Sequence, residues 1–196
     1  MTILVITTGG TIGAEPYEDI KYPARIKLMP PQGVDPVRDV LGRELSVYST
    51  RCVAFEHRDS NYIDEPYRAK LLQLIEREPE KAVLITHGTD TLLQMAEYIF
   101  HRQSSPGLKD KVVFLTGAMV PLACGSISDG YMNLGFALEQ LAHGNRKPGI
   151  YIVLCDYLVP EKQEVWAPHL YHFEPGRYDK YHDPDDASRS RIRAVG

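Results

Sequence analysis

Hydroxyl side chains and glycines follow two short apolar runs of this chain. The first run continues into Thr7–Thr11, which reads Thr-Thr-Gly-Gly-Thr, and the second into Thr86–Thr91, which reads Thr-His-Gly-Thr-Asp-Thr. Glycines allow a ligand to approach the backbone closely and leave N–H groups free, as an oxyanion site requires. A threonine hydroxyl becomes a nucleophile when a base takes its proton or its pKa is lowered. Thr11 is therefore a candidate nucleophile, and a threonine that caps a turn is the alternative.

Asp90 is the candidate binding group of the second segment. It follows a predicted strand at the start of a predicted helix, where the positive helix terminus keeps a carboxylate ionised. An ionised carboxylate in a cleft suits an ammonium group, and the alternative is an ordinary N-cap. We expect His87, at the end of the strand, to be a hydrogen-bonded structural residue. Neither segment contains a Gly-x-Gly-x-x-Gly pattern or a P-loop lysine, so neither indicates a dinucleotide or phosphate site.

Alternating apolar runs and amphipathic segments are placed to bring these side chains together. The runs are apolar throughout, which is typical of parallel strands buried on both faces. Their alternation with helices predicts an α/β domain with a doubly wound, mainly parallel sheet and helices on both faces. Loops beyond the carboxyl ends of such strands line a ligand crevice, so the two threonine segments can meet in one site. The strands are predicted over residues 2–8, 49–55, 82–86, 111–116 and 149–156, and the helices over 35–41, 64–76, 90–100 and 129–142.

Two local patterns complete this prediction. Residues 13–32 are polar and rich in proline, which predicts a long ordered or mobile loop. Thr91 and Gln94 have the spacing of a capping box, which predicts that Thr91 caps the helix that follows.

Composition narrows the class of protein. The 196 residues are 43% hydrophobic and carry a net charge of −4 with mixed signs, which fits one sizeable core and indicates no nucleic-acid surface. The cysteines lack metal or disulfide spacing, which predicts a reducing, cytoplasmic location. We expect no signal peptide and no membrane span, because no apolar run approaches about 18 residues. The histidines near the end lack companion ligands at suitable spacing, so no metal is predicted.

Taken as a set, the motifs resemble those of the bacterial-type asparaginase/glutaminase family. Thr8–Ile12 and His87–Thr91 resemble its two signature motifs, and Gly117–Pro121 with Ser128–Gly130 resembles its third loop and the start of the next helix. The resemblance covers about residues 2–156, in the order expected for that family. It implies the family's N-terminal, flavodoxin-like domain in a short single-domain member.

The resemblance also implies roles for individual residues. Thr11 matches the nucleophile that attacks the side-chain amide, and Thr89 matches the second threonine, which belongs to a Thr-Lys-Asp triad. Tyr22 is our choice for the tyrosine of the mobile loop that assists Thr11, with Tyr17 as the second choice. The implied substrate-binding residues are Asp90 for the α-ammonium, Ser60 for the α-carboxylate, and Gly10, Gly88, Asp59 and Ala118 around them.

One position departs from the family pattern. Trp166 stands where the triad lysine is expected, and Lys162 is the nearby candidate for that role. Loss of a general base costs roughly 10²–10⁴ in rate. The first hypothesis is accordingly a cofactor-free amidohydrolase of the asparaginase class that acts through an acyl-threonine. The second is a non-catalytic module that binds a small amino acid or acidic ligand. The third, an amidotransferase subunit acting with tRNA, is disfavoured because no basic surface is evident.

The resemblance and the composition together predict the organisation of the chain. Residues 1–156 form the α/β domain, 157–183 an aromatic and histidine-rich arm packed on that domain or on a partner subunit, and 184–196 a flexible tail. The expected partners are a small amide substrate and further copies of the chain, as a homodimer or homotetramer. No nucleic acid or membrane partner is expected.

Overall fold

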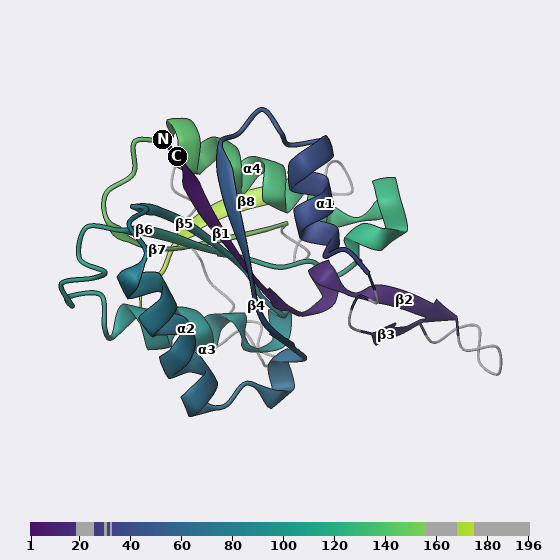
Figure 1. Cartoon of the computed structure of the whole chain (residues 1–196), viewed down its shortest axis with the longest axis horizontal. Helices are drawn as coiled ribbons and strands as arrows, with labels where there is room; N and C mark the ends of the chain where they lie inside the picture. Colours follow the sequence, from purple (N-terminus) through teal and green to yellow (C-terminus); the bar gives the residue numbers. More distant parts are fainter. Residues whose placement is uncertain (19–25, 30, 32, 156–167, 175–196) are drawn as a thin grey trace, which may run out of the picture.

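A six-stranded sheet forms the centre of the protein (Figure 1). The computed structural model describes residues 1–18, 26–29, 31, 33–155 and 168–174. The strand order is β4-β1-β5-β6-β7-β8, in which the first five strands are parallel and β8 is antiparallel to β7. These strands are β1 (Ile3–Gly9), β4 (Thr50–Arg58), β5 (Ala82–Thr86), β6 (Val112–Thr116), β7 (Gly149–Cys155) and β8 (Pro168–His172). The predicted doubly wound, mainly parallel α/β fold is confirmed.

Helices cover both faces of the sheet (Figure 1). On one face lie α1 (Pro36–Arg43) and α4 (Asp129–His143), and on the other α2 (Glu65–Arg77) and α3 (Leu92–Phe100). Successive residues of β1 enter different cores, because Ile3 packs with α1 and α4 whereas Leu4 packs with α2 and α3. All seven residues of β1 are buried. This double burial is the reason that the strand is apolar without alternation.

Short polar side chains cap the start of three of the helices. The carboxylates of Asp35 and Asp64 each accept a backbone N–H at 2.9 Å, and the Ser128 hydroxyl accepts one at 3.0 Å. Thr91 stands at the corresponding position before α3, but its hydroxyl donates to the Ser60 carbonyl at 3.0 Å and makes no capping bond. The predicted capping box of Thr91 and Gln94 is therefore wrong, because the neighbouring loop takes the hydroxyl.

Strands form in two regions where the sequence predicts none. Within residues 13–32, β2 (Glu15–Glu18) and β3 (Ile26–Met29) pair as an antiparallel hairpin that projects from the sheet (Figure 1). The prediction of a loop is wrong for these strands. Pro16 is compatible with pairing because each strand of a two-stranded ribbon is an edge strand. Within the predicted arm, Pro168–His172 forms β8, which extends the sheet beyond β7.

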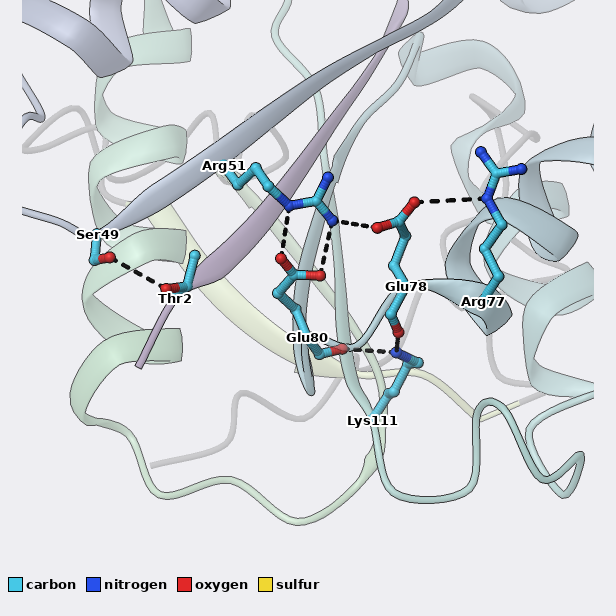
Figure 2. Close-up of polar contacts among 7 residues, drawn as sticks. All are labelled: Thr2, Ser49, Arg51, Arg77, Glu78, Glu80 and Lys111. Carbon is cyan, nitrogen blue, oxygen red and sulfur yellow. Dashed lines mark hydrogen bonds and ion pairs between the residues drawn. The ribbon is translucent and has the colours of Figure 1, made fainter.

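A polar cluster connects the amino ends of parallel strands (Figure 2). It lies at the end of the sheet opposite the loops that contain the two threonine segments. The guanidinium of Arg51 contacts the carboxylates of Glu78 and Glu80, and its Nε lies 2.7 Å from Glu80 Oε1. Lys111 is buried, and its ammonium donates to the carbonyls of Glu78 at 2.6 Å and Glu80 at 2.7 Å. The segment between α2 and β5 is thus fixed to the starts of β4 and β6.

None of the helices in the described ranges is both long and apolar enough to cross a membrane.

Candidate active site

A pocket of about 300 Å³ lies at the carboxyl ends of β1 and β5. These strands are neighbours, and the chain passes from β1 to β4 on one side and later to β5 on the other. Such a reversal of strand order is the usual ligand position in an open α/β sheet. The lining residues are Gly9, Gly10, Thr11, Gly13, Ala14, Pro31, His57, Arg58, Asp59, Ser60, Gly88, Thr89, Asp90 and Met119.

Most of the predicted site residues meet in this pocket. The residues concerned are Thr11, Thr89, Ser60, Asp90, Asp59, Gly10 and Gly88. Ala118 does not line the pocket, because its side chain is buried in the core under α1 and α4, and the adjacent Met119 lines it instead. Tyr22, Lys162 and Trp166 lie outside the described residues.

Thr11 is placed by a backbone turn that requires glycine. Gly10 has φ +76°, a value that L side chains rarely adopt, and a Cβ there would lie 2.4 Å from Gly88 Cα. The chain then enters a 3₁₀ turn over Thr11–Gly13, in which Thr11 is half-buried. The left-handed turn therefore serves two purposes, because it lets the two threonine loops touch and it brings Thr11 to the pocket.

The second threonine loop packs equally closely against Ser60. A Cβ on Gly88 would lie 2.5 Å from Ser60 Cβ and 2.6 Å from its Oγ, so the absence of a side chain permits this approach. The Thr91 hydroxyl bonds to the Ser60 carbonyl and holds the two loops together. Gly10, Gly88 and Ser60 thus form the contact from which the pocket is built.

Two carboxylates face the pocket and share one partner. Asn61 Nδ2 donates to Asp59 Oδ1 at 3.1 Å and to Asp90 Oδ2 at 3.3 Å. Both aspartates are exposed. Asp90 is not the N-cap of α3, since Thr91 holds that position. The sequence analysis assigns no role to Asn61, and its position directly after Ser60 is the only signal that could have indicated one.

His87 has the structural role expected of it. Its side chain is fully buried, and Nδ1 lies 2.8 Å from the Gly88 carbonyl, to which it donates. Burial lowers the pKa of His87 to about 4, so the ring is neutral near pH 7. It does not line the pocket, but it fixes the backbone between β5 and Thr89.

A further histidine at the pocket is missed by the sequence. His57 lies near the end of β4, with Nε2 at 3.0 Å from Thr7 Oγ1 and 3.2 Å from Asp35 Oδ2. The Thr7 hydroxyl donates to the same Asp35 oxygen at 2.5 Å. Burial alone would raise the pKa of Asp35, but the bonds from His57, Thr7 and the Val37 N–H lower it below its usual range. The sequence signal that could have indicated His57 is the run of polar residues that follows the second predicted strand.

The third loop is held by a buried carboxylate. Asp129 Oδ1 accepts the backbone N–H of Met119 at 3.1 Å and that of Val120 at 2.9 Å, and Asn133 Nδ2 donates to Oδ2 at 3.2 Å. These bonds place Met119 at the pocket. Among the residues described, no three histidine, cysteine or acidic side chains are grouped to hold a metal ion.

These observations define a flavodoxin-like α/β domain whose hydroxyl-rich pocket lies where the strand order reverses. The family model described as asparaginase, N-terminal, matches residues 2–163. The chain therefore belongs to the asparaginase family and corresponds to its N-terminal domain.

Solved structures agree with this assignment. The thermostable L-asparaginase from Thermococcus kodakarensis is similar with a TM-score of 0.60 and 26% identity, over 78% of this chain and 43% of its own. A probable cytoplasmic L-asparaginase from Campylobacter jejuni has a TM-score of 0.60 and 23% identity, over 79% of this chain and 44% of its own, which shows the fold. This chain thus spans less than half the length of either structure. No curated protein sequence matches it.

Proposed function

We propose that the chain is a cofactor-free amidohydrolase of the asparaginase class. Its substrate is the side-chain amide of asparagine or a related small amide, and its products are the acid and ammonia. The observation that carries the proposal is the meeting of Thr11, Thr89 and Asp90 in one pocket of an asparaginase-family domain. Those side chains come from two loops that are distant in sequence and contact each other through Gly10 and Gly88.

The reaction that this pocket supports is acyl transfer to threonine. Thr11 Oγ1 bonds to the carboxamide carbon, the carbon–nitrogen bond breaks, and ammonia leaves. Water then opens the acyl-threonine and releases the acid. We assign the oxyanion to backbone N–H groups of the turn that follows Gly9, where Gly10 has no side chain to hinder a ligand.

Substrate recognition uses the opposite charges of an amino acid. The exposed carboxylates of Asp59 and Asp90 attract the α-ammonium, because a charge-assisted hydrogen bond is stronger than a neutral one. Ser60 is assigned to the α-carboxylate. It is buried beside Gly88, so its position is fixed before a ligand enters.

The family relation also supports a proposal for the oligomeric state, the location and the partners of the chain. We infer that the chain acts as a homodimer or homotetramer in the cytoplasm, on a small molecule and without a nucleic-acid or membrane partner. The three cysteines are free thiols, which is compatible with a reducing compartment.

Ammonia release tests the enzyme directly. We would measure it from asparagine, glutamine and a panel of small amides, with Thr11→Ala as the key variant. The expected result is turnover by the wild type and a loss of about 10⁴-fold or more in kcat for the variant, because the nucleophile is gone. Mass spectrometry of the wild type with substrate should detect the acyl group on Thr11.

The control variant for this experiment changes a hydroxyl outside the pocket. Thr2→Ala removes an exposed hydroxyl that bonds to Ser49 at the other end of the sheet, and it should leave turnover unchanged. Absence of turnover on every amide would contradict the enzyme. If aspartate then still raised the melting temperature, a non-catalytic ligand-binding module would be favoured, since a ligand that binds the native state stabilises it.

A further inference from the structure

An irregularity between two strands turns His57 toward the pocket. Thr7 of β1 pairs with Ala54 of β4, but Gly9 pairs with Arg58, so β4 advances four residues while β1 advances two. Bulges of this kind re-aim side chains and are common beside active sites. The Tyr67 hydroxyl donates to the Glu56 carbonyl at 2.6 Å and holds the irregular segment in place. The bulge is therefore a fixed feature, and it makes His57 part of the pocket wall.

The contacts of His57 determine which ring nitrogen carries a proton. The Thr7 hydroxyl gives its hydrogen to Asp35, so both Thr7 Oγ1 and Asp35 Oδ2 face Nε2 as acceptors. Nε2 must then be the protonated nitrogen, and in the neutral ring Nδ1 keeps a lone pair. Both of these contacts of His57 to described side chains use Nε2. Since His57 and Thr11 line the same pocket, Nδ1 is the ring nitrogen that we assign to face it.

The other side chains of the pocket are not equivalent bases. Among its described lining residues, the aspartates already accept hydrogen bonds from Asn61, Arg58 has no acceptor atom, and the remaining polar groups are hydroxyls. His57 supplies the one imidazole in that part of the lining. A carboxylate behind an imidazole holds its orientation and stabilises the imidazolium that forms when the ring accepts a proton.

We propose that His57, oriented by Asp35 and Thr7, is the proton acceptor for acyl transfer at Thr11. The inference rests on the proposed amidohydrolase function and adds its base. Nδ1 takes the Thr11 hydroxyl proton as the oxygen bonds to the amide carbon, and gives it to the nitrogen that leaves as ammonia. Water next loses a proton to Nδ1 as its oxygen bonds to the acyl carbon. That proton returns to Thr11 Oγ1 when the ester bond breaks, and Asp35 stays a carboxylate throughout.

His57→Gln is the variant that separates this role from packing. Glutamine can still donate to Asp35, but it has no basic nitrogen. We expect kcat for ammonia release to fall by roughly 10²–10⁴-fold with little change in KM, because a general base is removed. His101→Gln changes an exposed histidine paired with Glu97 and should keep the wild-type rate and KM.

A nitrogen-15 NMR measurement on the wild type tests the tautomer without substrate. We expect the neutral ring of His57 to carry its proton on Nε2, and a proton on Nδ1 would overturn the proposal. Asp35→Asn should lower kcat and favour the other tautomer, since the acceptor facing Nε2 is weakened. An active wild type with an equally active, folded His57→Gln variant overturns the role of His57 alone. A wild type that is inactive on every amide overturns the proposed function as well.

Discussion

At the scale of single residues, His87 makes stability depend on pH. Its pKa is about 4 in the folded protein because of burial, against an ordinary histidine value of about 6.5. Between these values the unfolded chain binds more protons than the folded one, so stability falls as the pH is lowered through this window. The expected loss is about 3 kcal/mol of unfolding free energy between pH 7 and pH 4.

Urea unfolding across this pH range measures the effect, and His87→Asn isolates it. Asparagine can donate to the Gly88 carbonyl in place of Nδ1, but it does not titrate. The variant should be less stable than the wild type at pH 7 and should lose the His87 part of the slope between pH 7 and pH 4. Equal slopes in the two proteins would show that another group causes the dependence.

The residues of the site were predictable where a motif marks them. Thr11, Thr89 and Asp90 each follow an apolar strand directly, and the topology brings such strand ends together. His57 was not predictable in this way, because it faces the pocket only through the irregular pairing of β4. Ala118 shows the converse, since its motif is present while its side chain points into the core.

At the scale of elements, loop-to-loop contact depends on the glycine at the end of β5. Gly88→Ala would place Cβ 2.5 Å from Ser60 Cβ, although its φ of −65° suits any residue. Overpacking of this kind costs about 1–3 kcal/mol, and the separated loops should also lower ammonia release. Gly42→Ala is the control, because a Cβ there meets nothing within 4 Å in helix α1. It should gain about 0.5–1 kcal/mol in urea unfolding. A Gly88→Ala protein as stable as wild type would contradict the contact.

Helices and strands whose apolar residues repeat at a regular spacing were predictable from the sequence. Strands that are recognised only by their pairing with another strand were not. Helix α2 begins after Asp64 and presents apolar residues at helical spacing, so its position follows from local sequence. Strands β2 and β8 are recognised by their pairing with β3 and β7, and their sequences show no clear period. The predicted cap of α3 was wrong for the same reason, because the Thr91 hydroxyl donates to the carbonyl of Ser60 in a loop that is distant in sequence.

At the scale of the whole molecule, the two ends of the sheet differ in what holds them. The pocket end is built from glycines in close contact and from loops that meet across β1, β4 and β5. The opposite end is held by Arg51 with two glutamates and by the buried Lys111 (Figure 2). Because the two ends are held by different residues, we expect that stability can be changed without changing the pocket.

Lys111→Met tests this separation. Burial lowers the pKa of Lys111, while Glu80 and Glu78 oppose that shift and favour the ammonium form. Methionine fills the space but leaves two carbonyls without their donor, which should cost about 2 kcal/mol in urea unfolding. Lys109→Met removes an exposed charge from the same connection and should change stability by less than about 0.5 kcal/mol. Ammonia release by folded Lys111→Met should equal that of the wild type at 25 °C, because the pocket lies at the other end of the parallel strands. A parallel loss of kcat would show that the two ends of the sheet are coupled.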